Sequence, residues 1–376
     1  MRVGIDARFW SQTGVGRYTR NLVINLGKLD SKNRYILFVN KQDYENIKSQ
    51  ISKLKYKNFE IIKVNIKWHS IAEQVSFPRI LNKYKLDLVH FPYFSHPIFY
   101  NKPFVVTIHD LIINHFPTGK ASTLPIAVYS LKLLGYKQVL SHAVKKSKKI
   151  IVPLEFVKND LIRTLKVPAS KIEVAAEGFD PAISPSKLQP THYNLPTRYF
   201  LYVGNAYPHK NLVKLIEGFY RAKLKDVNLV LVGKDDFFYK RLEKEKFPNL
   251  IFLHDVSDTE LFHLYRNSVA AVSASLMEGF GLLPLEAFGA GTIPVVSSIG
   301  AFREVCGDTA IYFNPQDAND IASKLVEASK LAKSERTAFI KKGKSLLTKF
   351  SWSKMAVQTL HTYNSLIPRI ETNKSE

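Results

Sequence analysis

Short apolar runs alternate with longer stretches of helical periodicity from one end of the chain to the other. The runs are rich in Val, Ile, Leu, Phe and Tyr, which is typical of strands buried on both faces of a parallel sheet. Strands are predicted near residues 2–6, 35–39, 59–65, 86–91, 103–108, 149–152 and 172–176, and near 199–203, 227–232, 250–253, 269–273, 292–296 and 310–313. Strands that alternate with helices are typical of βαβ units, so we predict an α/β protein with parallel sheets.

One stretch interrupts this alternation, between Asp180 and Arg198, because no periodic pattern continues through it. It is punctuated by Pro181, Pro185, Pro190 and Pro196. The 376 residues also exceed what one typical core accommodates. We therefore predict two doubly wound, Rossmann-like domains that face each other across a cleft. The first takes residues 1–180, the linker 181–197 and the second 198–350.

The most informative turn follows the predicted strand 269–273. Gly279 and Gly281 allow the backbone to come close to a ligand and to adopt positive φ. We expect a helix to start near Pro284, where free amides and the helix dipole favour an anion. Glu278 and Glu286 flank this anion site and can accept hydrogen bonds from sugar hydroxyls. Phosphate beside sugar hydroxyls indicates a nucleotide-sugar, although an ordinary helix N-terminus with acidic neighbours has the same local pattern.

Similar turns follow other predicted strands. Gly14, Gly16 and Arg17 lie after the first strand and before a helix expected over 18–26. There the glycines allow a phosphate or sugar to approach, and a plain tight turn is about as probable from these residues alone. His109 and Asp110 end the strand at 103–108, at the edge where ligands of such sheets bind, although a lone histidine is more often structural.

The second domain opens with Gly204 after its first strand, followed by His209 and Lys210 before a helix. Lys210 can bind a diphosphate as a point charge, and an exposed surface lysine is the alternative. His209 would be only partly charged at neutral pH.

The segment EGFGLLPLEAFGAGTIPVV, which begins at Glu278, closely resembles the EGFGLPPLEAMACGTPVV signature of retaining glycosyltransferases of family four. TGVGRYTRNLVINL, VTIHDL, YVGNAYPHKNL and HDVSD resemble further segments of the same family. The resemblance covers residues 1–367 and implies the GT-B fold. It also implies that a helix from Phe350-Ser351-Trp352 to about Ile367 completes the first domain.

The resemblance implies a role for each matching residue. Glu278 would hold the donor-sugar hydroxyls, Glu286 the nucleotide ribose, and His109 would contact the donor sugar. Lys210 would bind the diphosphate, with His209 in place of the family's arginine. The remaining donor-side positions would be Gly14, Gly16, Gly204, Val256 (through its backbone, to the base), Gly279, Phe280, Gly281 and Leu282, and the acceptor-side positions Arg17 and Asp110. The chain departs from the family at Pro153, Leu154 and Glu177, the last replacing a usual asparagine.

Charge adds a possible partner. The net charge is +22, of which residues 1–180 carry +16, from 29 Lys and Arg against 13 Asp and Glu. Lysines lie among apolar residues over 114–149, where we expect a loop through Pro117 and Gly119 and then a long helix. The members are Lys120, Lys132, Lys137, Lys145, Lys146, Lys148 and Lys149. This basic, partly amphipathic segment indicates an anionic membrane or a lipid-diphosphate acceptor, or else a solvated helix face.

Composition excludes other classes. Cys306 is the single cysteine, so neither an internal disulfide nor a cysteine zinc site is possible, and a reducing compartment is favoured. No apolar run has membrane-span length, and the chain opens on a strand-like run. We therefore expect a cytoplasmic protein, either free or peripheral on the inner face of the cytoplasmic membrane. The sequence contains no Asp-x-Asp pair, from which we expect no metal and no cofactor.

Together these observations predict a retaining, metal-independent hexosyltransferase. The donor is a nucleotide-diphosphate-sugar, with GDP-mannose favoured by the family resemblance. The favoured acceptor is a saccharide linked to polyprenyl diphosphate, in lipopolysaccharide or other cell-surface polysaccharide synthesis. A soluble sugar or sugar-phosphate acceptor and a non-catalytic partner subunit stay open as alternatives. A nucleic-acid partner is not expected, because aromatic residues do not interleave with the basic clusters as in RNA-binding motifs.

Overall fold

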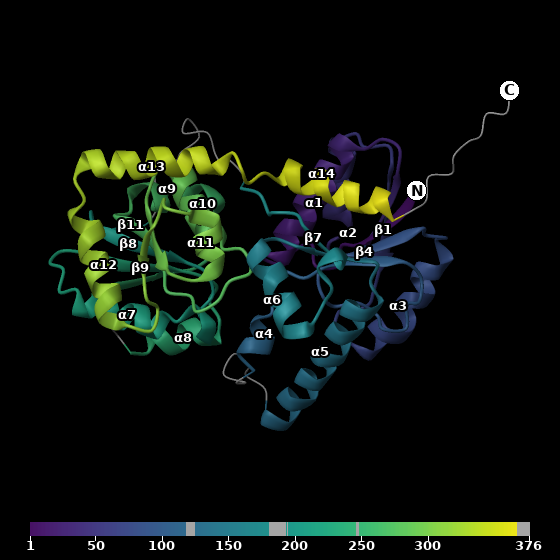
Figure 1. Ribbon diagram of the computed structural model, residues 1–376, viewed down its shortest axis with the longest axis horizontal. Coiled ribbons are helices and arrows are strands. Elements are labelled where there is room, and N and C mark those ends of the chain that lie inside the picture. Colours follow the sequence, from purple (N-terminus) through teal and green to yellow (C-terminus); the bar gives the residue numbers. More distant parts are fainter. Residues whose placement is uncertain (118–124, 180–192, 194, 246–247, 367–376) are drawn as a thin grey trace. The chain divides into compact units, whose positions relative to one another are not determined.

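The computed structural model describes residues 1–117, 125–179, 193, 195–245 and 248–366 (Figure 1). The chain divides into two compact units. The first unit comprises Met1–Leu111, Leu124–Gly178 and Trp352–Glu376, and the second comprises Ile112–Thr123 and Phe179–Ser351. The predicted linker 181–197 lies mostly outside the described residues, as do Gly119, Lys120 and the predicted helix end at Ile367.

The first unit contains a parallel seven-stranded sheet in the order β3-β2-β1-β4-β5-β6-β7. Its strands are β1 (Arg2–Asp6), β2 (Arg34–Asn40), β3 (Phe59–Val64), β4 (Leu88–Phe91), β5 (Phe104–Thr107), β6 (Lys149–Val152) and β7 (Ile172–Val174). Its helices are α1 (Val15–Leu29), α2 (Tyr44–Lys53), α3 (Ile71–Lys83), α5 (Ile126–Lys146), α6 (Glu155–Leu165) and α14 (Trp352–Ser365). The predicted helix 18–26 is therefore longer at both ends, and Lys149 belongs to β6 rather than to the basic helix.

Helix α14 brings the last described part of the chain onto the first unit, where it packs beside α1 (Figure 1). Trp352 and Tyr363 of α14 are buried in one core with residues of β1, β2 and α1. The hydroxyl of Tyr363 also lies 2.6 Å from Nδ1 of His90, a fully buried side chain of β4. This core therefore includes residues from both ends of the chain.

The second unit contains a parallel six-stranded sheet in the order β10-β9-β8-β11-β12-β13. Its strands are β8 (Tyr199–Val203), β9 (Asn228–Val232), β10 (Leu250–Leu253), β11 (Ala270–Ser273), β12 (Pro294–Ser297) and β13 (Ile311–Phe313). Its helices are α4 (Ile112–His115), α7 (Leu212–Arg221), α8 (Phe237–Glu243), α9 (Asp258–Asn267), α10 (Leu282–Ala290), α11 (Gly300–Cys306), α12 (Ala318–Lys330) and α13 (Lys333–Leu347).

The predicted α/β class and parallel sheets are confirmed, and every predicted strand is present, with ends that move by three residues or fewer. Three details of the prediction are wrong. Helix α10 starts at Leu282, so Pro284 is its third residue rather than its first. Lys210 ends a short 3₁₀ turn, Pro208–Lys210, and α7 begins only at Leu212. Helix α4 was not predicted, and it groups with the second unit although it follows β5 in the chain.

Candidate functional site

Topology singles out one place in each sheet. In the second unit β8 and β11 are neighbours, and the chain proceeds from β8 toward one edge of the sheet and from β11 toward the other. In the first unit β1 and β4 have the same relationship. Ligands of open α/β sheets bind outside the carboxyl ends of the strands at such a switch point. Most of the predicted donor residues follow β8 and β11, so these meet at the switch point of the second unit.

The turn after β11 requires glycine at one position. Gly281 has φ +87° at the N-cap of α10, and a Cβ there would lie 2.5 Å from the ring of Phe302. Gly279 does not have a positive φ, so the expectation that both glycines supply one is wrong for Gly279. The side chain of Phe280 is buried and packs against Phe350. The start of α10 is therefore held in place from both sides of the turn.

Glu278 and Lys210 form a tight ion pair at this switch point. Lys210 Nζ donates to both carboxylate oxygens of Glu278, at 2.7 and 2.8 Å, and Ser275 Oγ donates to one of them at 2.6 Å. Burial raises the pKa of the Glu278 carboxyl, but Lys210 and Ser275 outweigh it, and the net pKa is lowered. The site thus holds an ionised carboxylate and an ammonium group that neutralise each other.

Backbone contacts fix the two loops that carry this pair. Asn211, in the left-handed region at φ +59°, donates from Nδ2 to the carbonyls of Ala274 at 3.1 Å and Pro315 at 2.7 Å. The amide of Leu276 donates to the carbonyl of His209 at 2.8 Å. The loop after β8 and the loop after β11 are therefore joined directly.

His209 cannot serve as a second cation. Its side chain is buried beside Tyr207 and Phe116, and Phe116 comes from the segment after α4. Burial, with the charge of Lys210, lowers the pKa of His209 to about 4. The imidazole is neutral at pH 7, so only Lys210 of the two carries a charge there.

The other donor-side residues of the second unit lie at or after the carboxyl ends of its strands. Glu286, half-buried on α10, accepts a hydrogen bond from the hydroxyl of Tyr265 on α9 at 2.8 Å. Val256 is half-buried in the loop between β10 and α9, whose first turn Ser257 caps. Gly204 follows β8, and its carbonyl accepts from the Tyr239 hydroxyl at 2.8 Å. Leu282 is the first residue of α10. These positions stay predictions as donor contacts.

In the first unit, His109 follows β5 and both of its ring nitrogens are in hydrogen bonds. Nδ1 lies 2.9 Å from the Glu177 carboxylate, and Nε2 lies 2.9 Å from the carbonyl of Pro92. Burial lowers the pKa of His109, but the bonds to Glu177 and Pro92 and the charges of Glu177 and Asp110 outweigh it, so the net pKa is raised. From the sequence, Glu177 stood out only as a departure from the family, and its pairing with His109 was missed.

The start of α1 lies close to this histidine. The ring of Tyr18 meets that of His109 edge-on, with centroids 4.9 Å apart. Gly14 caps α1 at φ +54°, and a Cβ on Gly16 would lie 2.6 Å from the carbonyl of Trp10. Gly16 is therefore needed for close packing of the loop on itself. Arg17 and Asp110 are half-buried, and their acceptor-side role stays a prediction.

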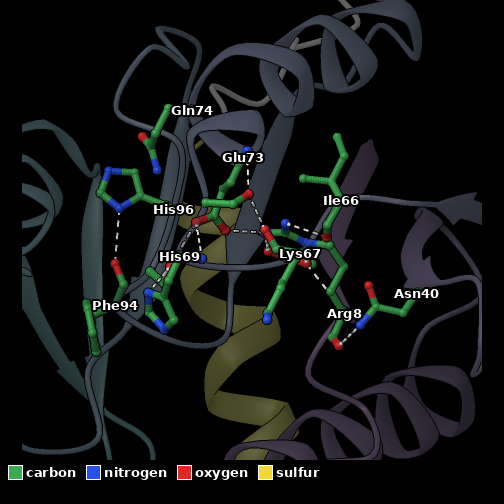
Figure 2. A network of polar contacts seen from close by, with 12 residues as sticks. Arg8, Asn40, Ile66, Lys67, His69, Glu73, Gln74, Phe94 and His96 are labelled. Atoms are coloured by element: carbon green, nitrogen blue, oxygen red, sulfur yellow. Dashed lines mark hydrogen bonds and ion pairs between the residues drawn. The ribbon is translucent and has the colours of Figure 1, made fainter. Parts of the chain in front are cut away.

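A buried charge network that the sequence analysis missed links the loops of the first sheet (Figure 2). Arg8, fully buried after β1, donates to the carboxylates of Asp6 at 2.7 Å and Glu73 at 2.6 Å. Its carbonyl accepts from Asn40, at the end of β2, at 2.6 Å. Glu73 in turn accepts from the amide of His69 at 2.8 Å. An Asp-x-Arg sequence directly after a buried strand was the available signal.

Much of α5 is exposed, and its exposed residues include apolar and basic side chains. Ile126, Leu131 and Leu134 are 85%, 70% and 56% exposed, whereas Leu140 and Ala143 are buried. The helix has no acidic residue, and its lysines are Lys132, Lys137, Lys145 and Lys146. No helix among the described residues is long and apolar enough to cross a membrane. In the same parts of the chain, no three His, Cys, Asp or Glu side chains lie close enough together to hold a metal ion.

Two family models match the chain, one in each half of the sequence. The model described as Glycosyltransferase Family 4 matches residues 13–183, and the model described as Glycosyl transferases group 1 matches residues 187–346. Among curated relatives, the O-antigen chain mannosyltransferase RfbU of Salmonella typhimurium is 28% identical over 231 residues, 60% of this chain and 61% of the relative. The O-antigen chain mannosyltransferase B of Escherichia coli is 26% identical over 300 residues, 76% of each protein.

Solved structures resemble the whole chain. A glycosyltransferase from Rickettsia africae superimposes with a TM-score of 0.68 at 20% identity, over 98% of both chains. Anabaena Alr3699/HepE, solved in complex with UDP and glucose, gives 0.72 at 16% identity, over 97% of this chain and 100% of that one. At such identities the similarity speaks for the fold alone, and it confirms the predicted GT-B fold.

Proposed function

This chain belongs to glycosyltransferase family 4, and from that premise we propose that it transfers a hexosyl residue from a nucleotide-diphosphate-sugar to a saccharide acceptor. The O-antigen mannosyltransferases among its relatives support a role in cell-surface polysaccharide or lipopolysaccharide synthesis. They also favour mannose, carried by GDP, as the donor.

The observation that carries this proposal is the Lys210–Glu278 pair at the switch point, beside the start of α10. When the donor binds, Lys210 and the amides at the start of α10 contact the diphosphate. Glu278, released from Lys210, accepts hydrogen bonds from hydroxyls of the donor sugar. The ligand thus replaces one internal ion pair by an ion pair between Lys210 and the diphosphate and by hydrogen bonds from sugar hydroxyls to Glu278, which limits the cost of separating the pair.

The transfer proceeds with retention and without a metal ion. Lys210 and the dipole of α10 stabilise the charge that develops on the departing diphosphate. The departing phosphate oxygen takes the proton of the acceptor hydroxyl as the bond from the sugar to the acceptor forms. Glu278 holds the sugar hydroxyls and is not needed as the base, because the departing phosphate oxygen takes the acceptor's proton.

The acceptor is carried by a lipid, and the enzyme works on the cytoplasmic face of an anionic membrane. The support is helix α5, whose exposed apolar side chains and four lysines accompany no acidic residue. Its exposed apolar side chains can insert among the acyl chains while its lysines contact the anionic headgroups. A soluble sugar or sugar-phosphate acceptor is the alternative.

A thermal-shift screen of the full chain against GDP, UDP, ADP and dTDP, with magnesium and with a chelator, tests the donor site. A ligand that binds the native state raises the melting temperature by mass action. We expect GDP to raise it most, equally in both conditions. A shift that requires magnesium would contradict the metal-independent site. The absence of any shift would favour the non-catalytic partner subunit.

A further inference from the structure

The pair formed by His109 and Glu177 joins three separate strand ends of the first unit. His109 follows β5, Pro92 follows β4, and Glu177 lies three residues after β7. Because β6 lies between β5 and β7 in the sheet, Glu177 reaches across one strand to meet His109. The two side chains are 12% and 9% exposed, so water contributes little to their solvation.

The acceptors around His109 determine how many protons its ring carries. The carbonyl of Pro92 can only accept, so the hydrogen bond at 2.9 Å places a proton on Nε2. An ionised carboxylate can also only accept, so the bond to Glu177 at 2.9 Å places a second proton on Nδ1. With both nitrogens protonated, the ring is an imidazolium that has no free donor and no acceptor.

We propose that Glu177 is a positioning residue, which holds His109 as this imidazolium and fixes its ring orientation at the edge of the first sheet. The consequence for the reaction is definite. His109 cannot take a proton from the acceptor hydroxyl, and it contributes as a positive charge held in a fixed position. The kinetic part of this inference rests on the glycosyl transfer proposed above, whereas the charge and orientation of His109 do not depend on it.

The surroundings of His109 support the assignment. One further acid, Asp110, lies beside it in the chain, and its charge also raises the pKa of His109. The remaining titratable groups that face it are buried or aromatic and carry no negative charge at neutral pH: His90 of β4, Tyr18 of α1, and Tyr93. Glu177 is therefore the acid in direct contact with the ring, and its removal should change the charge of His109 most.

The first experiment determines the protonation state of His109 directly, by NMR titration of the full chain labelled in its histidine rings. The signal of His109 is identified by its loss in His109→Gln. We expect both ring nitrogens to be protonated at pH 7, and Glu177→Gln to lower the titration midpoint by about one pH unit or more. Glu173→Gln is the matched control, because Glu173 lies on β7, pairs with Lys149 of β6 and does not touch His109. A neutral His109 in the wild type, or an unshifted midpoint in Glu177→Gln, overturns the proposal.

The second experiment measures kcat and KM for the donor over about pH 6 to 9. In Glu177→Gln we expect kcat to fall about tenfold for each pH unit above the lowered midpoint, with the donor KM unchanged. Lowering the pH should restore kcat, which a merely structural defect would not allow. Wild-type kcat at every pH in Glu177→Gln would overturn the positioning role. If the wild type transfers no sugar at all, the proposed function fails, and the NMR titration still decides the state of His109.

Discussion

Each unit places a carboxylate against a cation at the carboxyl edge of its sheet, but the two pairs differ in kind. Glu278 pairs with a lysine, and Glu177 pairs with a histidine whose charge depends on its partner. The lysine can be drawn away by a phosphate and keep its charge. The histidine is held by acceptors on both sides. The difference indicates a pair that opens for ligand in the second unit and a fixed pair in the first.

The largest effect is expected from Glu278→Gln. The amide keeps the shape of the side chain but loses the charge that orients Lys210 and accepts from the sugar hydroxyls. We expect kcat/KM to fall about a hundredfold or more, while the nucleotide still raises the melting temperature. Glu217→Gln, an exposed change on α7, is the control. Activity near that of the wild type would mean that the donor sugar does not meet Glu278.

Next in size is Lys210→Met, which leaves the buried Glu278 without its cation. We expect a loss of about 2 to 3 kcal/mol in the free energy of unfolding, because an unpaired buried charge is costly, and loss of the thermal shift by nucleotide. Urea denaturation measures the first effect. A restored thermal shift in Lys210→Arg would show that the charge matters. If Lys210→Met keeps full nucleotide binding, the pair does not open for phosphate.

The buried histidines make the two units respond differently to acid. Burial lowers the pKa of His90 to about 3 and of His96 to about 4 in the first unit, and that of His209 to about 4 in the second. As pH falls below about 6.5, these histidines become protonated in the unfolded chain but stay neutral in the folded protein, so the free energy of unfolding falls. His109 acts oppositely, because its raised pKa stabilises the first unit below pH 6.5 and this contribution is lost as pH rises through the raised value.

From pH 7 to 5 we expect each fully buried neutral histidine to cost about 2 kcal/mol, so the first unit loses more stability than the second. The three tryptophans, Trp10, Trp68 and Trp352, all belong to the first unit, so their fluorescence follows its unfolding alone. Circular dichroism follows both units. Urea transitions that stay coincident by the two probes at pH 5 would contradict this difference.

The smallest effect on folding is expected from Leu131→Ser combined with Leu134→Ser on α5. Both side chains point away from the core, so stability should change by less than about 0.5 kcal/mol. Binding to vesicles with anionic lipid should weaken about tenfold or more, and wild-type binding should weaken with salt. Val213→Ser, equally exposed on α7 of the second unit, is the control. If the double variant binds these vesicles as tightly as the wild type does, α5 is not the part of the protein that contacts the membrane.

Local signals account for most of what could be predicted. Strand and helix periodicity located the elements, because side chains in a buried parallel strand and on a helix repeat over short distances. The glycine turn before α10 was predicted for the same reason, because the left-handed φ of Gly281 is a requirement of the local backbone conformation. The helix start was misplaced by two residues because proline is compatible with more than the first position of a helix.

The sequence by itself determined the α/β class, the parallel sheets and the family, and with them the glycine turn and the carboxylates near the donor site. Only the tertiary structure decided which charges meet. Lys210 and Glu278 are 68 residues apart in the chain, as are His109 and Glu177, and Arg8, in the loop after β1, contacts Glu73 of α3. The order of the strands in each sheet brings these residues together, and no local sequence pattern specifies that order. The surroundings that the fold supplies then set their pKa values: burial and Lys210 lower the pKa of His209, whereas Glu177 and Pro92 outweigh burial and raise that of His109.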